Sequence, residues 1–535
     1  MERRDIIKKL TILPFAGGFL PLESMLSPSS GELSAGPNIY QSIGVEPVIN
    51  CVGTFTIIGG SIERPEVIEA MHAAAGFFVQ YDELALGIGR RLAELTGAEW
   101  GMISAGCAAG MKHVTAACVA GGNPEKLVRI PDLTGFDKTE VVIPRSSRNV
   151  YDHAIRNIGV SIITVETPEE LKKALNPGTA MIYLMTGNDT LPGQKFSVES
   201  VAEMAKPLNI PLLVDAAAED LTIPNVHLQN GATVVAYSGG KAICGPQCAG
   251  LLLGKKDILM SAWQASSPHH GTGRDNKVGR EEMLGMLAAV EAWVARDHNE
   301  KWRIWLSYLT NIAKRVSSIE GITTTINEPS GLNNHSPVLT ISWNPDRLNI
   351  TGAEAAEELS LTPPRIAVHS GSNEQEGTTS LRITAGQMQP GNDKIVGDRI
   401  YDLLSQKRTK PEPMAPPASD ISGRWAVDIE FYSSKSRHAF FIEQDGNWIQ
   451  GSHKGEFSLR EMVGTIEGDE VKLSSSERLV ADNVPFIFSG TLTGDSITGQ
   501  IYMGEYINAR FIAKRDNYRG RRRLIRYPKG QPLAT

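Results

Sequence analysis

Short apolar runs alternate with amphipathic segments through the middle of the chain. The runs occupy residues 141–143, 161–165, 180–185, 211–214 and 233–236. Their length and composition are typical of strands that are buried on both faces of a sheet. Residues 167–175 and 197–206 have the spacing of helices between such strands. This alternation predicts an α/β large domain, residues 38–300, with a mostly parallel sheet covered by helices.

The large domain is expected to end in a long helix at about residues 279–300. A smaller α+β domain would follow at 301–407, with strands near 337–342 and around Arg382. In such an arrangement the active site lies at the carboxyl ends of the parallel strands.

A second unit follows a proline-rich linker at residues 408–419. From about residue 420 the apolar positions recur at every second residue, and Asp445-Gly446 is typical of a hairpin turn. About eight such strands predict a small antiparallel barrel or sandwich at 420–516, similar to a lipocalin. We expect this domain to serve docking or oligomer stability, with ligand binding in its interior as the alternative. Residues 517–535 form a basic tail.

The composition is that of a soluble protein with more than one domain. The 535 residues are 41% apolar and 21% charged, which suits large buried cores. The formal net charge of −7 argues against a broad nucleic-acid surface. All five cysteines lie in apolar or glycine-rich stretches, so we interpret them as buried packing residues. No spacing of histidines and cysteines indicates a metal site.

The amino terminus has the order of an export signal. Arg3-Arg4 opens a basic stretch, residues 10–20 are mildly apolar, and a Ser/Gly/Pro-rich run follows. This order resembles a twin-arginine signal, which exports folded proteins. The apolar stretch is too short for a stable membrane anchor. We therefore expect residues 1–37 to direct export to a bacterial periplasm, with a cytoplasmic location as the alternative.

Lys241 is the most informative residue of the chain. It follows an apolar run and the turn Ser238-Gly239-Gly240, whose glycines would let a planar group approach the backbone. A lysine at a buried strand end is a candidate nucleophile toward an aldehyde, for which pyridoxal 5′-phosphate is the natural candidate. Asp215 ends another apolar run about 26 residues earlier, room for one step between parallel strands. Its carboxylate would keep the pyridine nitrogen protonated, and small Ala217 would leave a face open for the ring.

A phosphate site is expected where a third apolar run meets a helix. The turn Ser104-Ala105-Gly106-Cys107 leads into an alanine-rich helix that Gly121 closes. Free N–H groups and the dipole at a helix start favour a phosphate dianion. Ser104, Gly106 and Cys107 are therefore candidate phosphate residues, the alternative being tight packing of a small-residue helix on the sheet.

Together these motifs resemble the selenocysteine synthase-like branch of fold-type I pyridoxal-phosphate enzymes. That branch includes L-seryl-tRNA(Sec) selenium transferase and the D-glucosaminate-6-phosphate ammonia-lyase group. The matching pieces are residues 48–56 with 59–61, 95–99, 238–241 with 245–250, and 381–388, within about 38–407. The selenium transferase has an aspartate after its Ser-Gly pair, whereas Gly240 here favours the ammonia-lyase group. We find no counterpart of the transferase's tRNA-binding region before residue 38, and expect no nucleic-acid partner.

The resemblance implies a role for each matching residue. Lys241 would form a Schiff base with the cofactor and shuttle protons, Asp215 would pair with the pyridine nitrogen, and His153 would stack on the ring. Arg382 would clamp the substrate carboxylate, because guanidinium and carboxylate form a bidentate pair. Further contacts are implied for Ser104, Gly106, Cys107, Ala217 and Ser238 with the cofactor, and for Arg274 and Thr54 with the substrate. Arg274 would reach the site of a neighbouring subunit in a homodimer or larger homo-oligomer.

The implied reaction is α,β-elimination of a hydroxy or sugar amino acid, with release of ammonia. Racemisation, aldol cleavage and transamination stay open, because the outcome depends on which substrate bond stands perpendicular to the ring. A selenium transferase and a non-catalytic scaffold without the cofactor are the remaining alternatives.

Overall fold

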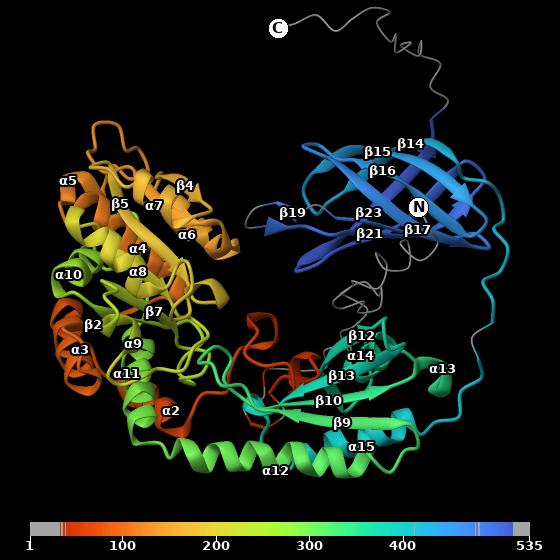
Figure 1. The fold of residues 1–535 in the computed structure, drawn as a ribbon, viewed down its shortest axis with the longest axis horizontal. Helices are drawn as coiled ribbons and strands as arrows, with labels where there is room; N and C mark the ends of the chain where they lie inside the picture. The colour runs from red at the N-terminus through yellow and green to blue at the C-terminus, as the bar shows by residue number, and fades with distance from the viewer. Residues whose placement is uncertain are drawn as a thin grey trace, which may run out of the picture. The chain divides into compact units, whose positions relative to one another are not determined.

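The computed structural model describes residue 33 and residues 36–37, 39–410, 412–476, 478–479 and 482–516 (Figure 1). The chain forms two compact units, one that runs to Lys410 and one that contains the strands after it. Each unit has its own hydrophobic core. In this part of the chain, no helix is long and apolar enough to span a bilayer. The expected signal at 1–37 and the basic tail at 517–535 fall almost wholly outside the described residues.

The core of the first unit is a seven-stranded sheet in the order β2-β8-β7-β6-β5-β3-β4. Neighbours from β7 to β4 pair in parallel, and β8 runs antiparallel to both β7 and β2. The predicted α/β fold with a mostly parallel sheet is therefore confirmed. The strands are β2 (Trp100–Ser104), β3 (Glu140–Pro144), β4 (Ser161–Val165), β5 (Thr179–Met185), β6 (Leu212–Asp215), β7 (Val234–Ser238) and β8 (Gly250–Gly254).

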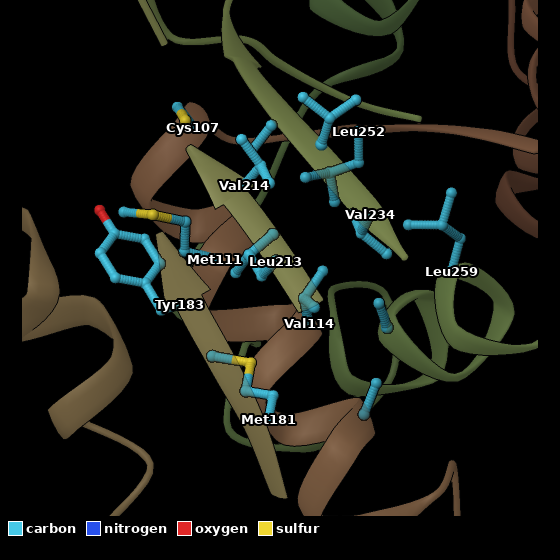
Figure 2. Close-up of a cluster of buried hydrophobic side chains, with 14 of the residues drawn as sticks. Cys107, Met111, Val114, Met181, Tyr183, Leu213, Val214, Val234, Leu252 and Leu259 are labelled. Carbon is cyan, nitrogen blue, oxygen red and sulfur yellow. The ribbon is translucent and has the colours of Figure 1, made fainter. Parts of the chain in front are cut away.

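Helix α4 (Cys107–Ala120) is buried along almost its whole length, because it packs between the sheet and other helices. Figure 2 shows Met111 and Val114 of α4 among strand residues such as Met181, Leu213 and Val214. The other helices of this region are α2 (Pro65–Ala75), α3 (Tyr81–Thr96), α5 (Pro124–Leu127), α6 (His153–Arg156), α7 (Pro168–Ala174), α8 (Val198–Ala205), α9 (Val226–Gln229), α10 (Lys256–Ala265) and α11 (Arg280–Ala295). Because α4 packs closely on the sheet, the start of this helix is held beside the ends of the strands.

The single helix expected at 279–300 is wrong at its carboxyl end. Helix α11 stops at Ala295, and α12 (His298–Val316) begins after Asp297. The Asp297 side chain accepts a hydrogen bond of 3.0 Å from the Glu300 N–H, so it caps a new helix instead of continuing the old one. Arg296 is consequently left at the junction of the two helices.

Helix α12 packs against the sheet of the smaller domain, whose strands follow the order β12-β13-β10-β9. The predicted strands near 337–342 and around Arg382 are β10 and β13 of this sheet. The elements are β9 (Ile322–Asn327), β10 (Val338–Trp343), α13 (Pro345–Leu348), α14 (Gly352–Leu361), β12 (His369–Asn373), β13 (Thr378–Thr384) and α15 (Asn392–Leu404), with a short parallel pair of β1 (Val48–Asn50) and β11 (Arg365–Ala367).

The second unit is a closed antiparallel barrel in the order β14-β15-β16-β17-β18-β21-β22-β23. Alternating burial along each strand puts every second side chain inside, which explains the period of two in the sequence. Of the two predicted architectures, the barrel is confirmed. The strands are β14 (Gly423–Glu430), β15 (Lys435–Asp445), β16 (Trp448–Lys454), β17 (Leu459–Glu467), β18 (Glu470–Ser475), β21 (Phe486–Thr493), β22 (Ser496–Met503) and β23 (Tyr506–Arg515), with a separate pair of β19 (Arg478–Leu479) and β20 (Asp482–Asn483).

A polar chain crosses the aromatic interior of this barrel. His453 Nε2 lies 2.7 Å from His438 Nδ1, and His453 Nδ1 lies 2.7 Å from Ser475 Oγ. The rings of Phe486 and Phe488 pack edge-on against His453. Burial lowers the pKa of His453 to about 3, and the nearby His438 adds to the effect. His453 is therefore held neutral at physiological pH.

We expect acid to destabilise the barrel through His453. Its pKa is about 3 when folded, whereas an unfolded histidine titrates near 6.5, so the folded state binds protons less readily. The contribution of this pKa difference to the free energy of unfolding is fully present above about pH 6.5. It is lost, at about 1.4 kcal/mol per pH unit, as pH falls toward 3. Urea unfolding of a fragment of residues 412–516 at several pH values measures it. His453→Gln should lower stability at neutral pH and flatten the pH dependence; an unchanged slope would contradict this assignment.

Candidate active site

Asp215 ends β6 with its carboxyl group buried, its residue only 4% exposed. The Tyr183 hydroxyl, from the neighbouring strand β5, donates to Asp215 Oδ2 at 2.8 Å. The Ala217 N–H donates to Oδ1 at 3.1 Å, and the Cys107 thiol lies 3.6 Å from the same oxygen. The carboxyl group is thus held in one orientation at the carboxyl end of the parallel strands.

The surroundings of Asp215 disfavour an isolated negative charge. Burial raises its pKa above the ordinary value, while the hydrogen bonds from Tyr183 and Ala217 and the positive charge of Lys241 oppose the rise. Burial and the charge of Asp215 also raise the pKa values of Tyr183 and Cys107 well above their usual ranges. Both groups therefore remain protonated donors, and Asp215 is suited to pair with a buried cation such as a protonated ring nitrogen.

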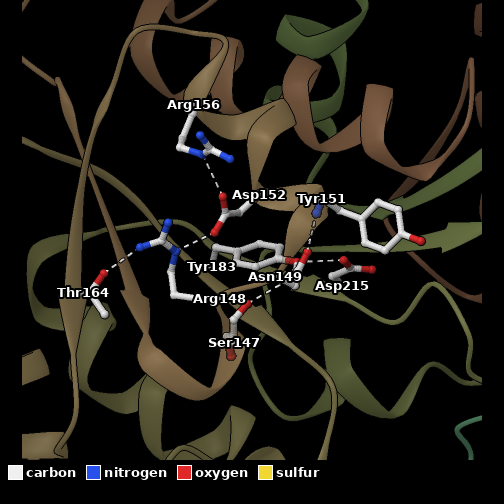
Figure 3. A network of polar contacts seen from close by, with 9 residues as sticks. All are labelled: Ser147, Arg148, Asn149, Tyr151, Asp152, Arg156, Thr164, Tyr183 and Asp215. Atoms are coloured by element: carbon white, nitrogen blue, oxygen red, sulfur yellow. Dashed lines mark hydrogen bonds and ion pairs between the residues drawn. The ribbon is translucent and has the colours of Figure 1, made fainter. Parts of the chain in front are cut away.

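Asn149 stabilises this arrangement by holding Tyr183 in place (Figure 3). Its amide nitrogen donates to the Tyr183 hydroxyl at 3.0 Å, and its amide oxygen accepts from the Tyr151 N–H at 2.7 Å. Asp152, fully buried in the same segment, pairs with Arg148 and Arg156. These bonds fix the loop between β3 and α6 beside Asp215.

His153 follows this fixed loop as the first residue of α6, and its side chain is exposed. The predicted stacking of its ring on a cofactor stays a prediction.

Lys241 lies beyond the end of β7, at the same edge of the sheet as Asp215, because β6 and β7 are parallel neighbours. Its charge acts on both Asp215 and Cys107. A side-chain carbon added at Gly239 would lie 2.7 Å from the Ala249 carbonyl oxygen. Gly239, two residues before Lys241, therefore lets the loop pack closely on Ala249, which is a different reason for a glycine than the approach of a cofactor.

The predicted phosphate turn has the expected form. Gly106 precedes α4 with φ of 89°, a conformation that favours glycine. The first intrahelical bond runs from the Gly110 N–H to the Gly106 carbonyl at 3.1 Å, so the preceding N–H groups of the first turn remain for a ligand. Ser104 donates its hydroxyl to the Gly106 carbonyl at 2.8 Å and thereby stabilises the turn.

Gly250 of β8 lies directly against this turn. A side-chain carbon at Gly250 would come within 2.4 Å of the Gly106 carbonyl carbon and 2.6 Å of the Cys107 nitrogen. Only a residue without Cβ lets the two segments pack this closely. Ser238, the partner of Gly250 across the β7–β8 pair, donates its N–H to the Ala217 carbonyl at 3.4 Å.

A cavity of about 720 Å³ adjoins these strand ends within the first unit. Ala242, next to Lys241, lines it together with Thr54 and, from the smaller domain, Arg382. Arg382 is exposed on β13 and pairs in register with His369, another lining residue. The predicted substrate residues Thr54 and Arg382 therefore share one cavity.

Arg274 does not line this cavity. It is exposed in the loop between α10 and α11, where its Nη1 donates to Ser267 Oγ at 3.3 Å. Its predicted contact with a neighbouring subunit stays a prediction.

Two of the five cysteines are not buried, contrary to our expectation. Cys244 is half-buried and lines the cavity, and Cys248 is exposed, whereas the other three are buried. Both lie in the loop between Lys241 and β8, in which Ile243, Pro246 and Ala249 are buried while Cys248 faces solvent. In the described residues, no cluster of three or more His, Cys, Asp or Glu side chains is suited to a metal ion.

Sequence reasoning missed Tyr183 and Asn149, and it missed two cations of the cavity wall, Arg296 and Lys301. Tyr183 carried a signal, because a hydroxyl in an otherwise apolar strand needs a buried partner. The sequence carried no such signal for Arg296 and Lys301, because they fell within or next to a helix that was expected to be continuous.

Comparisons with known proteins agree with this geometry. The Aminotransferase class-V family model matches residues 153–282. D-glucosaminate-6-phosphate ammonia lyase of Salmonella typhimurium (strain 14028s / SGSC 2262) is 32% identical over 295 residues, 54% of this chain and 77% of that protein. 5'-C-glycyluridine monooxygenase-decarboxylase of a Streptomyces species is 28% identical over 392 residues, 70% of this chain and 94% of that protein. L-seryl-tRNA(Sec) selenium transferase of Proteus mirabilis (strain HI4320) is 25% identical over 291 residues.

The solved structure of D-glucosaminate-6-phosphate ammonia-lyase superposes with a TM-score of 0.62 at 27% identity, covering 69% of this chain and 99% of that chain. This match and the curated relative fit the site that Asp215, Lys241 and the Gly106 turn form. The chain therefore belongs to the D-glucosaminate-6-phosphate ammonia lyase family, a family of fold-type I enzymes that use pyridoxal phosphate.

Proposed function

We propose that the protein is an ammonia-lyase that converts a hydroxylated amino acid of the sugar-acid type into a 2-oxo acid. The substrate loses its α-proton and β-hydroxyl, and water then replaces the amino group, so that one ammonia leaves overall. The observation that carries this proposal is the buried Asp215, held by Tyr183 and Ala217 at the same sheet edge as Lys241. The similarity to an ammonia lyase supports elimination over racemisation, aldol cleavage or transamination.

The residues present fit pyridoxal phosphate at three points. Asp215 offers a buried carboxylate for the ring nitrogen, Lys241 offers an amine, and the start of α4 at Gly106 offers N–H groups for the phosphate. When bound, the cofactor supplies an electron sink for the bond that breaks at the substrate α-carbon.

The side chains around it divide the remaining work. Lys241 Nζ accepts the α-proton and returns a proton to the departing hydroxyl, as a general base and acid. Tyr183 and the Ala217 N–H fix the orientation of the Asp215 carboxylate, which would pair with the ring nitrogen of the cofactor. Arg382, on the cavity wall, binds the substrate carboxylate as a bidentate fork.

We also propose that the protein is exported and that it acts as a homo-oligomer. The basic and apolar order of residues 1–37 supports export by a twin-arginine-like signal. Phe77 and Phe78, 71% and 97% exposed, suit a contact with a second copy of the chain. Arg274, which lies outside the cavity of its own chain, suits a contact with the partner's site.

The proposed reaction predicts release of ammonia and a 2-oxo acid from a panel of D- and L-hydroxy amino acids and sugar amino acids. Lys241→Ala should abolish turnover, because it removes the base, and should remove the visible absorbance of the lysine-linked cofactor. The panel is run with and without oxygen, since a monooxygenase-decarboxylase would consume oxygen and release carbon dioxide. Exchange of the α-hydrogen without oxo acid would favour a racemase instead.

Tyr183→Phe should lower kcat by about 10-fold, because the Asp215 carboxylate loses a hydrogen-bond donor. That hydrogen bond lowers the pKa of Asp215, so its removal raises this pKa. The acidic limb of the pH–rate profile should therefore move to higher pH. Tyr151→Phe, which alters an exposed ring of the same region, serves as the control and should leave the profile in place.

Gly250→Ala should weaken cofactor binding by about 10-fold, because the new carbon pushes on the Gly106 turn. Spectroscopic titration of the apoenzyme with pyridoxal phosphate measures the affinity, with circular dichroism as a check on folding. Gly87→Ala in α3 meets no atom within 4 Å and should bind the cofactor like the wild type. Equal affinity in the Gly250→Ala protein would show that the turn does not hold the phosphate.

A further inference from the structure

One histidine in the wall of the cavity is held at one ring nitrogen and open at the other. His335 Nδ1 lies 2.7 Å from Asp220 Oδ2, and both side chains line the cavity. In the described part of the chain, the second ring nitrogen, Nε2, has no hydrogen-bond partner, and the side chain is 31% exposed. A ring that a carboxylate holds at Nδ1 can exchange a proton with a ligand at Nε2.

The loop that carries this histidine is fastened beside the end of β6. The Asn334 N–H donates to the Ala218 carbonyl at 2.8 Å, and the Asp220 N–H donates to the Leu332 carbonyl at 3.0 Å. These bonds join a loop of the smaller domain to the segment that follows Asp215, and Ala218 and Asn334 line the cavity as well. The pair of Asp220 and the histidine therefore lies next to the sheet edge at which the cofactor would bind.

An indole restrains the histidine ring further. Trp302 packs on the His335 ring, with the two ring centres 4.7 Å apart and the planes at 36°. The indole N–H of Trp302 donates to Glu328 Oε2 at 2.6 Å, so the indole is itself fixed. A ring that is held by a hydrogen bond and by an aromatic contact can present its Nε2 to one side of a bound substrate.

The proposed carboxylate clamp belongs to the same part of the smaller domain. The histidine shortly precedes β10, in which Val338 pairs with Thr384 and Thr340 pairs with Arg382 across the β10–β13 ladder. Val338, Thr384 and Arg382 line the cavity together with the histidine. A substrate held at its carboxylate by Arg382 would therefore lie in the same part of the cavity as the histidine.

Several neighbours favour the ionised form of Asp220. Burial raises the pKa of its carboxyl group, whereas the hydrogen bond and the charge of His335 lower it, and the charges of His298 and Arg296 act in the same direction. Both His298 and Arg296 also line the cavity. A hydrogen bond to an ionised partner is stronger than one between neutral groups, so the carboxylate fixes the Nδ1–H of the ring. Nε2 is thereby the ring atom left for chemistry.

The proposed elimination requires a proton that Lys241 does not account for. The proton that Lys241 takes from the α-carbon leaves with the β-hydroxyl as water. The substrate then has a double bond between its α- and β-carbons and an amino group on the α-carbon. Before water can replace this amino group, the β-carbon must gain a proton, so that the carbon–carbon double bond becomes a carbon–nitrogen double bond. The reaction therefore needs a further proton donor.

We propose that His335 is this donor, with Asp220 as its positioning residue. The inference rests on the proposed function and adds a catalytic residue to it. The Nε2–H bond breaks and its proton joins the β-carbon. The electron pair of the carbon–carbon double bond forms the new C–H bond, while the nitrogen lone pair forms the carbon–nitrogen double bond. Water then adds to that bond and ammonia leaves, and the ring regains its proton from solvent through its exposed edge.

Turnover in heavy water tests where the new proton comes from. A sugar amino acid gives a product whose β-carbon is a CH₂ group, so a deuterium added there has two possible configurations, which NMR distinguishes. A fixed donor adds the deuterium from one side, and we expect a single configuration from the wild-type holoenzyme. In His335→Gln the unsaturated amino acid would leave and gain its β-proton from water, so the product should contain both configurations.

The rate of α-hydrogen exchange, measured in the same samples, separates this role from a structural one. A purely structural defect would slow the exchange, which depends on Lys241, and would leave a single configuration in the product. Loss of the donor should instead abolish the single configuration, whatever the rate.

Two further variants complete the experiment. Asp220→Asn keeps an acceptor for the Nδ1–H but removes the charge, so both configurations should appear with the wild-type one in excess; it also replaces His335→Gln if that variant does not fold. His298→Gln is the matched control, because His298 lines the same cavity but its Nε2 lies 3.1 Å from the Trp293 carbonyl. This control should keep a single configuration. Circular dichroism and cofactor absorbance establish that each variant is folded.

The outcomes separate the donor from the reaction. Both configurations in the wild-type product, or a single one from folded His335→Gln and Asp220→Asn, would overturn the role of His335 and leave the elimination intact. Both configurations from His298→Gln would show that any change in the cavity wall has this effect, and would overturn the role too. Absence of oxo acid from every substrate would instead refute the lyase assignment, and protonation of the β-carbon with it.

Discussion

A negative charge placed in the core is the constraint around which the first unit is organised. Asp215 has almost no solvent to stabilise it, so its neighbours must do so. Tyr183 does this from the adjacent strand, and Asn149 in turn holds Tyr183. The parallel order of the strands brings Lys241 to the same edge, where a cofactor with a cationic ring would complete the balance of charge.

The two places where this unit would bind anions differ in how they are built. At Gly106 the donors are backbone N–H groups whose geometry the fold fixes through Gly250. On β13 a single exposed arginine, Arg382, faces the cavity. The proposed phosphate site for the cofactor thus depends on the backbone, whereas the proposed site for the substrate carboxylate depends on a side chain that a single substitution would change.

Local sequence patterns were sufficient to predict much of this structure. They did not reveal which residues from distant parts of the chain come together. The strands that end at Asp215 and before Lys241 follow from short apolar runs, and the phosphate turn follows from small residues before a helix. The barrel follows from a period of two, although only closure of the sheet distinguished it from a sandwich. Tyr183 could not be assigned to Asp215 without the strand order. The position of Arg296 between two helices could not be predicted, because the apolar periodicity does not show that a new helix begins after the cap at Asp297.

The carboxy-terminal barrel also constrains how it can take part in assembly. Closure pairs β14 with β23, so the eight-stranded sheet has no unpaired margin whose peptide groups could recruit a strand from another molecule. Any association through this sheet must use outward side chains, such as those of Phe441 and Ile512, which are partly exposed. A sheet closed in this way can be appended to an enzyme without itself offering an edge for strand-by-strand polymerisation.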